Sequence, residues 1–213
     1  AEDRTILAYK GVNDELRFSE VPLKKLKTKW FYFSTMMNES FKTLERLSIY
    51  AKKNNIKISF NASTYLAKKG IQYLKRILIN TEIFILNNDE AGILTGEKNL
   101  EKQFLKLASL GPKIVVITLG KDGAIAYNGL YQYYVKARKV KISETTGAGD
   151  AFASGVLSGM IKKNNIEFAL KLAKANAESV ISLPGAKNNL LNYSEVLKII
   201  NRYPCHISKR IIK

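Results

Sequence analysis

The sequence of 213 residues contains one cysteine, Cys205, and one histidine, His206. A single thiol cannot form a disulfide within the chain, and such sparing use of cysteine is typical of proteins in a reducing compartment. One cysteine and one histidine also exclude the zinc sites that are built from several of these residues. We therefore expect a cytoplasmic protein without a structural zinc site.

Long apolar stretches are also missing. The sequence has no uninterrupted run of about 18 apolar residues, the length that would span a bilayer, and its first segment (AEDRTILAYK) has no basic region followed by an apolar one, so no secretory signal is visible. We expect no membrane association. Internal repeats and low-complexity linkers are absent as well, and the length favours one domain over residues 1–213.

Acidic residues are scarce, because 18 Asp and Glu stand against 35 Lys and Arg and give a net charge of +17. An excess of this size attracts polyanions such as nucleic acids. The basic residues are spread along the chain, however, and the densest run, at residues 24–29, lacks the interleaved aromatic side chains of a single-strand binder. We interpret the charge as a lysine-rich solvated surface and keep nucleic-acid binding as the less favoured alternative.

Strand-like and helix-like segments alternate along the sequence. Strands are predicted at residues 4–9, 30–34, 56–60, 83–86, 114–118 and 140–142, with a hairpin of 124–127 and 131–135 around Asn128-Gly129. Helices are predicted at 40–53, 65–78, after Asn88-Asp89, and at 100–110, 150–162, 166–181 and 194–201. This alternation predicts an α/β fold with a mostly parallel sheet covered by helices, in which ligands bind at the carboxyl ends of the strands.

The segment ETTGAGDAF, at residues 144–152, carries the most chemical information. Glycines at 147 and 149 leave backbone N–H groups unshielded and permit positive φ, and a helix that starts here adds its positive dipole end. Such amides can cradle a phosphoryl group while Asp150 accepts the proton of a hydroxyl. A glycine turn with Asp150 as an ordinary helix cap is the alternative.

Two common nucleotide fingerprints, GxxxxGK[ST] and GxGxxG, do not occur. A Ser-His-Asp hydrolase would have to use His206, in a segment that we interpret as a tail, so we set it aside.

The longer string ETTGAGDAFASG closely resembles the second signature of the ribokinase (PfkB) family of carbohydrate kinases, DTTGAGDAF. The resemblance implies a ribokinase-like three-layer αβα sandwich with a mostly parallel sheet, its core at 28–203 and remnants of a small β lid at 1–20. It also implies an ATP-dependent phosphotransferase that acts on a hydroxyl of a sugar or nucleoside. The implied catalytic residues are Gly147, Ala148 and Gly149 as an anion hole and Asp150 as the base.

The segment NNDEA at 87–91, followed by LTG at 94–96, resembles the family's NxxE block. By this resemblance Asn87 contacts the nucleotide and Glu90 helps to hold hydrated Mg²⁺, an ion that keeps several of its waters. The alternative is an ordinary helix N-cap at Asn88 or Asp89.

Two further segments match the family in the same order: TLGKDG at 118–123, and ANA at 175–177 with PGA at 184–186. The nucleotide-binding residues that they imply are Thr118, Gly120, Gly123 and Asn176. Taken alone, the first is a strand and a turn, and Asn176 is an ordinary residue on a helix.

The sequence also departs from the family. Family members open with a Gly-Gly signature and further strands, roughly another third of the protein, whereas this chain contains no Gly-Gly pair. The open alternative is therefore a catalytically incomplete nucleotide-binding remnant that needs another chain or an N-terminal portion. Its exposed sheet edge would favour association, a homodimer included. Glu144 stands where the family commonly has Asp, which puts activation by a monovalent cation in doubt. The acceptor contacts we name are Lys10, Asn13 and Asn61, with ordinary turn and edge residues as the alternative.

Overall fold

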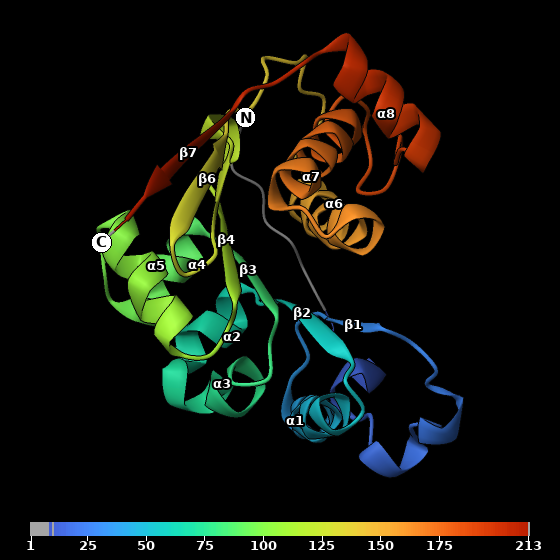
Figure 1. The fold of residues 1–213 in the computed structure, drawn as a ribbon. Helices are drawn as coiled ribbons and strands as arrows, with labels where there is room; N and C mark the ends of the chain where they lie inside the picture. The colour runs from blue at the N-terminus through green and yellow to red at the C-terminus, as the bar shows by residue number, and fades with distance from the viewer. Residues whose placement is uncertain (1–8, 10, 213) are drawn as a thin grey trace. The chain divides into compact units, whose positions relative to one another are not determined.

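The chain folds into alternating strands and helices, as a computed structural model of residue 9 and residues 11–212 shows (Figure 1). It divides into two compact units, the first ending at Val115 and the second beginning at Val116. Most of the predicted strand at 4–9, and the whole of Lys10, lie outside the described residues. The single domain expected over 1–213 stays a prediction beside this division.

The first unit is built from parallel strands joined by helices. Its strands are β1 (Trp30–Phe33), β2 (Lys57–Asn61) and β3 (Ile83–Asn87), and β4 (Ile114–Thr118) starts at its end. Its α-helices are α1 (Asn38–Lys53), α2 (Thr64–Lys69), α3 (Ile71–Leu78), α4 (Asn88–Thr95) and α5 (Leu100–Ser109). Strand β2 lies between β1 and β3 and is parallel to both, so helical crossovers must connect them.

Apolar burial explains why these segments take these forms. All four residues at 83–86 of β3 are at most 2% exposed, as expected for a parallel strand covered on both faces. The rings of Phe60 and Phe84 stack with their centroids 5.5 Å apart. In α1 the buried positions recur every three or four residues from Phe41 to Ala51, which gives the helix one face toward the core.

Residues 11–20 were expected to hold lid-like strands, and this prediction is wrong for the described part of that segment. The chain forms short 3₁₀ turns there, η1 (Gly11–Asp14) and η2 (Phe18–Glu20), followed by η3 (Leu23–Lys25). The reason lies in α1, because Ser40 Oγ accepts the Leu16 N–H at 2.8 Å and Thr43 Oγ1 donates to the Leu16 carbonyl at 2.7 Å. Both backbone groups of Leu16 are thus satisfied without a neighbouring strand.

The helix predicted at 65–78 is two helices. Gly70, between α2 and α3, has a φ of 82°, and its N–H donates to the Ala67 carbonyl at 3.1 Å. Glycine takes a positive φ at little cost, so the chain ends one helix and begins the next at this residue.

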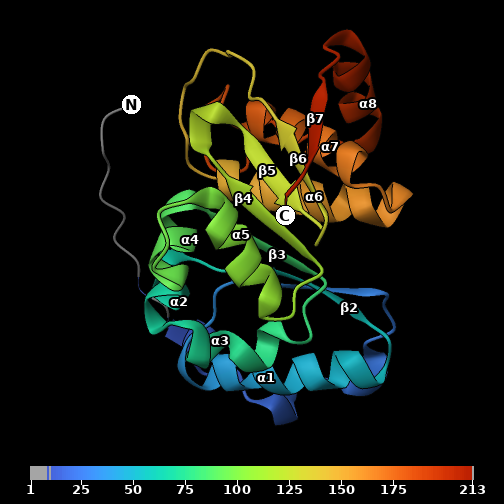
Figure 2. The same cartoon turned by 60° about the vertical axis from the view of Figure 1, so that its left-hand side comes forward.

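The second unit combines a hairpin with three helices. Its 3₁₀ turn η4 (Gly120–Asp122) precedes β5 (Ala124–Tyr127), β6 (Tyr131–Val135) and β7 (Ile207–Ile211), and its α-helices are α6 (Ala148–Lys163), α7 (Ile166–Val180) and α8 (Tyr193–Arg202). The predicted hairpin is confirmed, since Asn128 Oδ1 accepts the N–H groups of Leu130 and Tyr131 across the turn. Strands β5, β6 and β7 run side by side and antiparallel (Figure 2).

Two predictions for this unit are wrong, one of a strand and one of a tail. No strand forms at 140–142; the next residues, Ser143 and Glu144, instead donate their N–H groups to the Ile181 carbonyl just after α7. The C-terminal segment that we took for a tail forms β7, in which Ile207 pairs with Val135 of β6. The pairing partner of β7 lies more than 70 residues earlier, so its strand character depends on a long-range contact.

Helices α6 and α7 pack with their backbones almost touching (Figure 1). A Cβ added to Gly155 would lie 2.5 Å from the Ala173 Cα, and one added to Gly159 would lie 2.4 Å from the Ala169 Cα. Larger residues at these positions would force the helices apart. On the other side of α7, α8 packs through Val196.

The predicted α/β fold is confirmed, with parallel strands and helical crossovers in the first unit and an antiparallel hairpin with helices in the second. Within the described residues, no helix combines the length and apolarity needed to cross a bilayer.

Candidate active site

The glycine turn before α6 is the centre of the predicted site. Gly147 is the N-cap of α6 and has a φ of 83°, in the left-handed region that favours glycine. A Cβ at this position would lie 1.8 Å from the carbonyl oxygen of Ala186. Backbone conformation and close approach therefore both require glycine at 147.

The first turn of α6 presents backbone N–H groups. The N–H of Ala148 donates to the Thr145 carbonyl at 3.3 Å, and that of Ala151 donates to the Gly147 carbonyl at 2.9 Å. The N–H groups of Gly149 and Asp150 have no acceptor among the described residues. Free amides at the positive end of a helix are a common binding place for phosphate groups.

Asp150 lies in the same first turn, with its side chain exposed. Its neighbours Ala151 and Phe152 turn into the core, so the helix presents the carboxylate on its outer face. Among the described residues this carboxylate has no ion pair or hydrogen bond. The alternative of a simple helix cap does not apply, because Gly147 occupies the N-cap and no side chain caps this helix. Asp150 is thus accessible to a ligand held at the adjacent amides.

Asn176 was predicted to contact the nucleotide, and the structure gives its side chain a structural role. It is 6% exposed. Its Nδ2 donates to the Ala151 carbonyl of α6 at 2.9 Å, and its Oδ1 accepts the Leu191 N–H at 3.1 Å. Both ends of the amide are occupied by the protein, and a nucleotide contact by Asn176 stays a prediction.

The TLGKDG segment forms a tight turn between β4 and β5. Thr118 ends β4, and the Leu119 N–H donates to the Gly123 carbonyl at 2.8 Å. Gly123 has a φ of 101°, and a Cβ there would lie 2.0 Å from the Val135 carbonyl oxygen. Gly120 is exposed, with a φ of 58°. This turn needs Gly123 for close packing, and its nucleotide role stays a prediction.

Asn87 and Glu90 form a capping box at the start of α4. Asn87 Oδ1 accepts the Glu90 N–H at 2.8 Å, and Glu90 Oε2 accepts the Asn87 N–H at 2.9 Å. The other carboxylate oxygen of Glu90 accepts from Thr64 Oγ1 at 3.2 Å. The helix cap is therefore Asn87, not Asn88 or Asp89 as the alternative supposed.

The Glu90 carboxylate does not fit direct Mg²⁺ binding, because both oxygens accept hydrogen bonds from the protein and the residue is 8% exposed. Within the described residues, no group of three or more His, Cys, Asp and Glu is arranged to hold a metal ion. A water-mediated role for Glu90 stays a prediction.

Burial raises the pKa of the Glu90 carboxyl, although its bonds to Asn87 and Thr64 oppose the rise. Because the folded state holds this proton more tightly than the unfolded state, unfolding free energy falls as pH rises from the ordinary glutamate range through the raised pKa. Glu90→Gln removes this titration while an amide oxygen can still accept the Asn87 N–H. We expect the stability of the variant relative to the unmodified chain to increase over that pH window.

Urea unfolding of both chains from about pH 4 to pH 8 checks this expectation, since other titrating groups are common to the two. A stability difference that stays constant with pH would contradict the raised pKa.

The predicted acceptor residues are not brought together. Lys10 lies outside the described residues, and Asn13 is exposed in η1. Asn61, at the end of β2, donates through Nδ2 to the Tyr32 hydroxyl at 3.2 Å. An acceptor role for these three residues stays a prediction.

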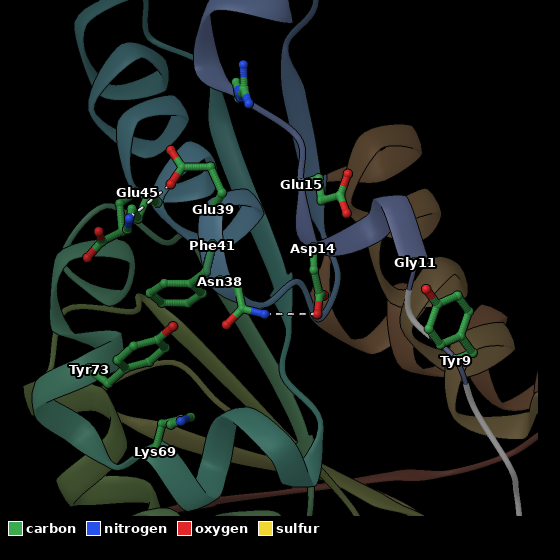
Figure 3. Close-up of a pocket in the computed structure, with 12 residues that line it drawn as sticks. Tyr9, Gly11, Asp14, Glu15, Asn38, Glu39, Phe41, Glu45, Lys69 and Tyr73 are labelled. Atoms are coloured by element: carbon green, nitrogen blue, oxygen red, sulfur yellow. Dashed lines mark hydrogen bonds and ion pairs between the residues drawn. The ribbon is translucent and has the colours of Figure 1, made fainter.

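A hollow of about 1290 Å³ lies in the first unit, beside α1 and η1 (Figure 3). The rings of Phe41 and Tyr73 stack at one side with centroids 4.2 Å apart, and Asn38 Nδ2 donates to Asp14 at 3.0 Å. Its lining carries both signs of charge, from four carboxylates and three cationic side chains. A lining of mixed charge selects no single class of ligand, and the sequence carried no signal for it.

Comparison with known proteins places the chain in a family. The sequence model for "pfkB family carbohydrate kinase" matches residues 1–192. The chain is 31% identical over 192 residues to an ATP-dependent 6-phosphofructokinase from Thermoanaerobacterium thermosaccharolyticum, covering 85% of this chain and 59% of the relative. It is 29% identical over 177 residues to a cytidine kinase from Thermococcus kodakarensis, covering 80% and 62%. The chain thus spans about three fifths of the length of these two relatives.

Solved structures support the same fold. Ribokinase from Thermotoga maritima superposes with a TM-score of 0.80 at 23% sequence identity, over 92% of this chain and 65% of the ribokinase. The predicted ribokinase-like fold is confirmed.

Proposed function

Because the chain belongs to the pfkB family of carbohydrate kinases, we propose that it transfers the γ-phosphoryl group of ATP to a hydroxyl of a sugar or nucleoside. The observation that carries this proposal is the first turn of α6, where free amides at Gly149 and Asp150 adjoin the exposed Asp150 carboxylate. The two relatives are named for chemically different acceptors, a phosphorylated sugar in the 6-phosphofructokinase and a nucleoside in the cytidine kinase. What these acceptors share is the hydroxyl group that receives the phosphoryl group.

In the proposed reaction, Asp150 accepts the proton of the acceptor hydroxyl. The hydroxyl oxygen then forms a bond to the γ-phosphorus as the bond from that phosphorus to the bridging oxygen breaks, and ADP leaves. The amides at 147–149 stabilise the negative charge on the transferred group. Gly149 offers its N–H directly, whereas Ala148 N–H makes a long bond of 3.3 Å to Thr145 that a phosphate oxygen can replace.

The base in this reaction must be free of other hydrogen-bond or ion-pair partners that would occupy its carboxylate. The Asp150 carboxylate has none among the described residues. The positive charge of the chain, +17, also favours an anionic donor such as ATP. Nucleic-acid binding stays the less favoured alternative, because the densest basic run of the sequence, at residues 24–29, has no interleaved aromatic residues.

A second candidate is a nucleotide-binding unit that needs another polypeptide for catalysis. The observation that favours it is the coverage of the relatives, 59% and 62% of their lengths. In the described part of the chain, β1 also stands first in the strand order, with β2 as its neighbour. A free parallel edge is a place where another strand can add, from a second copy or from another chain.

An ADP-release assay with a panel of sugars and nucleosides separates the two candidates. Release that depends on one acceptor, with phosphate recovered on that acceptor, supports the kinase. Binding of ATP by calorimetry, without phosphorylation of any acceptor, favours the incomplete unit. Tight DNA or RNA binding that persists at physiological salt would instead support the nucleic-acid alternative.

A further inference from the structure

Two loops of the second unit meet at the glycine turn. One is residues 143–147, which leads into α6, and the other is residues 181–186, which follows α7. They are joined through the backbone, where the N–H groups of Ser143 and Glu144 both point to the Ile181 carbonyl, the first at 2.8 Å. They are joined again through a side chain, because Glu144 Oε2 accepts the Gly185 N–H at 2.8 Å.

The second loop fixes the conformation of the first. The carbonyl of Ala186, one residue after Gly185, lies so close to Gly147 that a Cβ there would approach its oxygen to 1.8 Å. Gly147 in turn sets where α6 begins, and hence the direction of the amides at 148 and 149. A shift of residues 185–186 would therefore move the amides that the proposed reaction uses.

We infer that Glu144 is a positioning residue, whose carboxylate oxygen holds the loop at 185–186 against the glycine turn and so keeps the phosphate-binding amides aligned. This inference rests on the proposed function for its catalytic consequence. We call the hydrogen bond from Gly185 to Glu144, together with the close approach of Ala186 to Gly147, the clamp, and its existence does not depend on the proposed reaction. The half-buried position of Glu144 shields the bond from water.

The property of Glu144 that matters is its acceptor oxygen. An oxygen acceptor at this reach is needed, because the partner is a backbone N–H. Glutamine keeps both the length and an acceptor oxygen, whereas alanine removes the acceptor and aspartate is shorter by one methylene. If Glu144 acted instead through its negative charge, by binding a monovalent cation, Glu144→Gln would lose activity as Glu144→Ala does.

The fold should survive these substitutions. The backbone bonds to Ile181 do not involve the Glu144 side chain. Upstream, the Arg138 N–H donates to Glu178 Oε1 at 2.6 Å, and Lys174 Nζ pairs with the same carboxylate at 3.2 Å. Because these contacts fix the segment to α7, Glu144→Ala is expected to disturb the turn locally and leave the chain folded.

The kinetic test compares the full chain with Glu144→Ala, Glu144→Asp and Glu144→Gln, using the acceptor found in the panel. Glu144→Ala is expected to lower kcat about 10- to 100-fold, the range for a small misplacement of reacting groups, with the KM for ATP little changed. Glu144→Asp should resemble alanine, and Glu144→Gln should restore most of the loss. Glu167→Ala, at the opposite end of α7, serves as the matched control, roughly 20 Å away by helix length.

The same series in potassium, sodium and choline salts distinguishes the clamp from a cation ligand. The clamp predicts similar turnover of the unmodified chain in all three. Glutamine as inactive as alanine, or turnover that needs potassium and is lost in Glu144→Gln, would overturn the inference.

Amide hydrogen exchange tests the clamp without any phosphorylation. The Gly185 N–H and the amides of residues 144–150 are expected to exchange faster in Glu144→Ala and at nearly the unmodified rate in Glu144→Gln. Equal Gly185 exchange in the alanine variant and the unmodified chain would overturn the clamp. If Gly185 exchanges faster in Glu144→Ala than in Glu144→Gln but no acceptor is phosphorylated, the proposed function fails and the clamp stands.

Discussion

Asp150→Asn is expected to lower kcat by about 10²- to 10⁴-fold, the usual contribution of a general base, while ATP binding is retained. Asparagine has the same shape as aspartate but cannot accept the hydroxyl proton. We expect the variant to fold normally, because Asp150 is exposed and no described partner depends on its charge. Turnover with the acceptor from the panel, and ATP affinity by calorimetry, are the two measurements.

Glu167→Gln is the matched control for this experiment, since it removes one carboxylate from the first turn of α7 instead of α6. Turnover of Asp150→Asn within a few-fold of the unmodified chain would remove Asp150 from the role of base. Loss of ATP binding together with turnover would show that the aspartate acts on the nucleotide.

Gly147→Ala is expected to lower the unfolding free energy by about 2–5 kcal/mol, from the left-handed φ and the forced repacking together, and to abolish phosphoryl transfer. The added methyl group must displace the Ala186 carbonyl, which lies 1.8 Å from the ideal Cβ position. The amides of the first turn of α6 move with Gly147. Urea unfolding and the ADP-release assay measure the two effects.

Gly149→Ala is the comparison for stability. This glycine lies inside the first turn of α6, and no atom lies within 4 Å of its ideal Cβ position. Alanine is favoured over glycine in helices by about 0.5–1 kcal/mol, so the stability of this variant should be equal or higher. Equal losses of stability in both variants would show that the close approach at Gly147 is unimportant.

The features that the sequence predicted well are those decided by neighbouring residues. The hairpin at Asn128-Gly129 follows from its turn residues, and the helix after Gly147 begins two residues before the predicted start at 150. The buried strand at 83–86 is evident from its continuous apolar run. Local preference and tertiary structure agree at these places.

Other features depend on contacts that are distant in the sequence. Strand β7 is short and carries charges, and only its pairing with β6 makes it a strand. Residues 11–20 lack strand structure because Ser40 and Thr43 satisfy the backbone of Leu16. Neither partner is visible from the segment itself.

The candidate site was predictable in its composition and only partly in its contacts. The glycines and Asp150 stand out in the sequence, and the structure gives Gly147 the positive φ that the pattern requires. The inward orientation of Asn176 could not be predicted, because its partners are a carbonyl on α6 and an amide before α8. The bond from Glu144 to Gly185 was missed as well, although the departure of residue 144 from the family pattern was its one visible signal.

The near contact of α6 and α7 at Gly155 and Gly159 has a mechanical consequence. Two helices whose backbones approach this closely cannot slide past each other, so they move as one rigid body. Any hinge motion that displaces Asp150 must carry the loop after α7 along with it. Asp150 and the loop at 181–186 therefore move together, and the geometry between them is kept during such a motion.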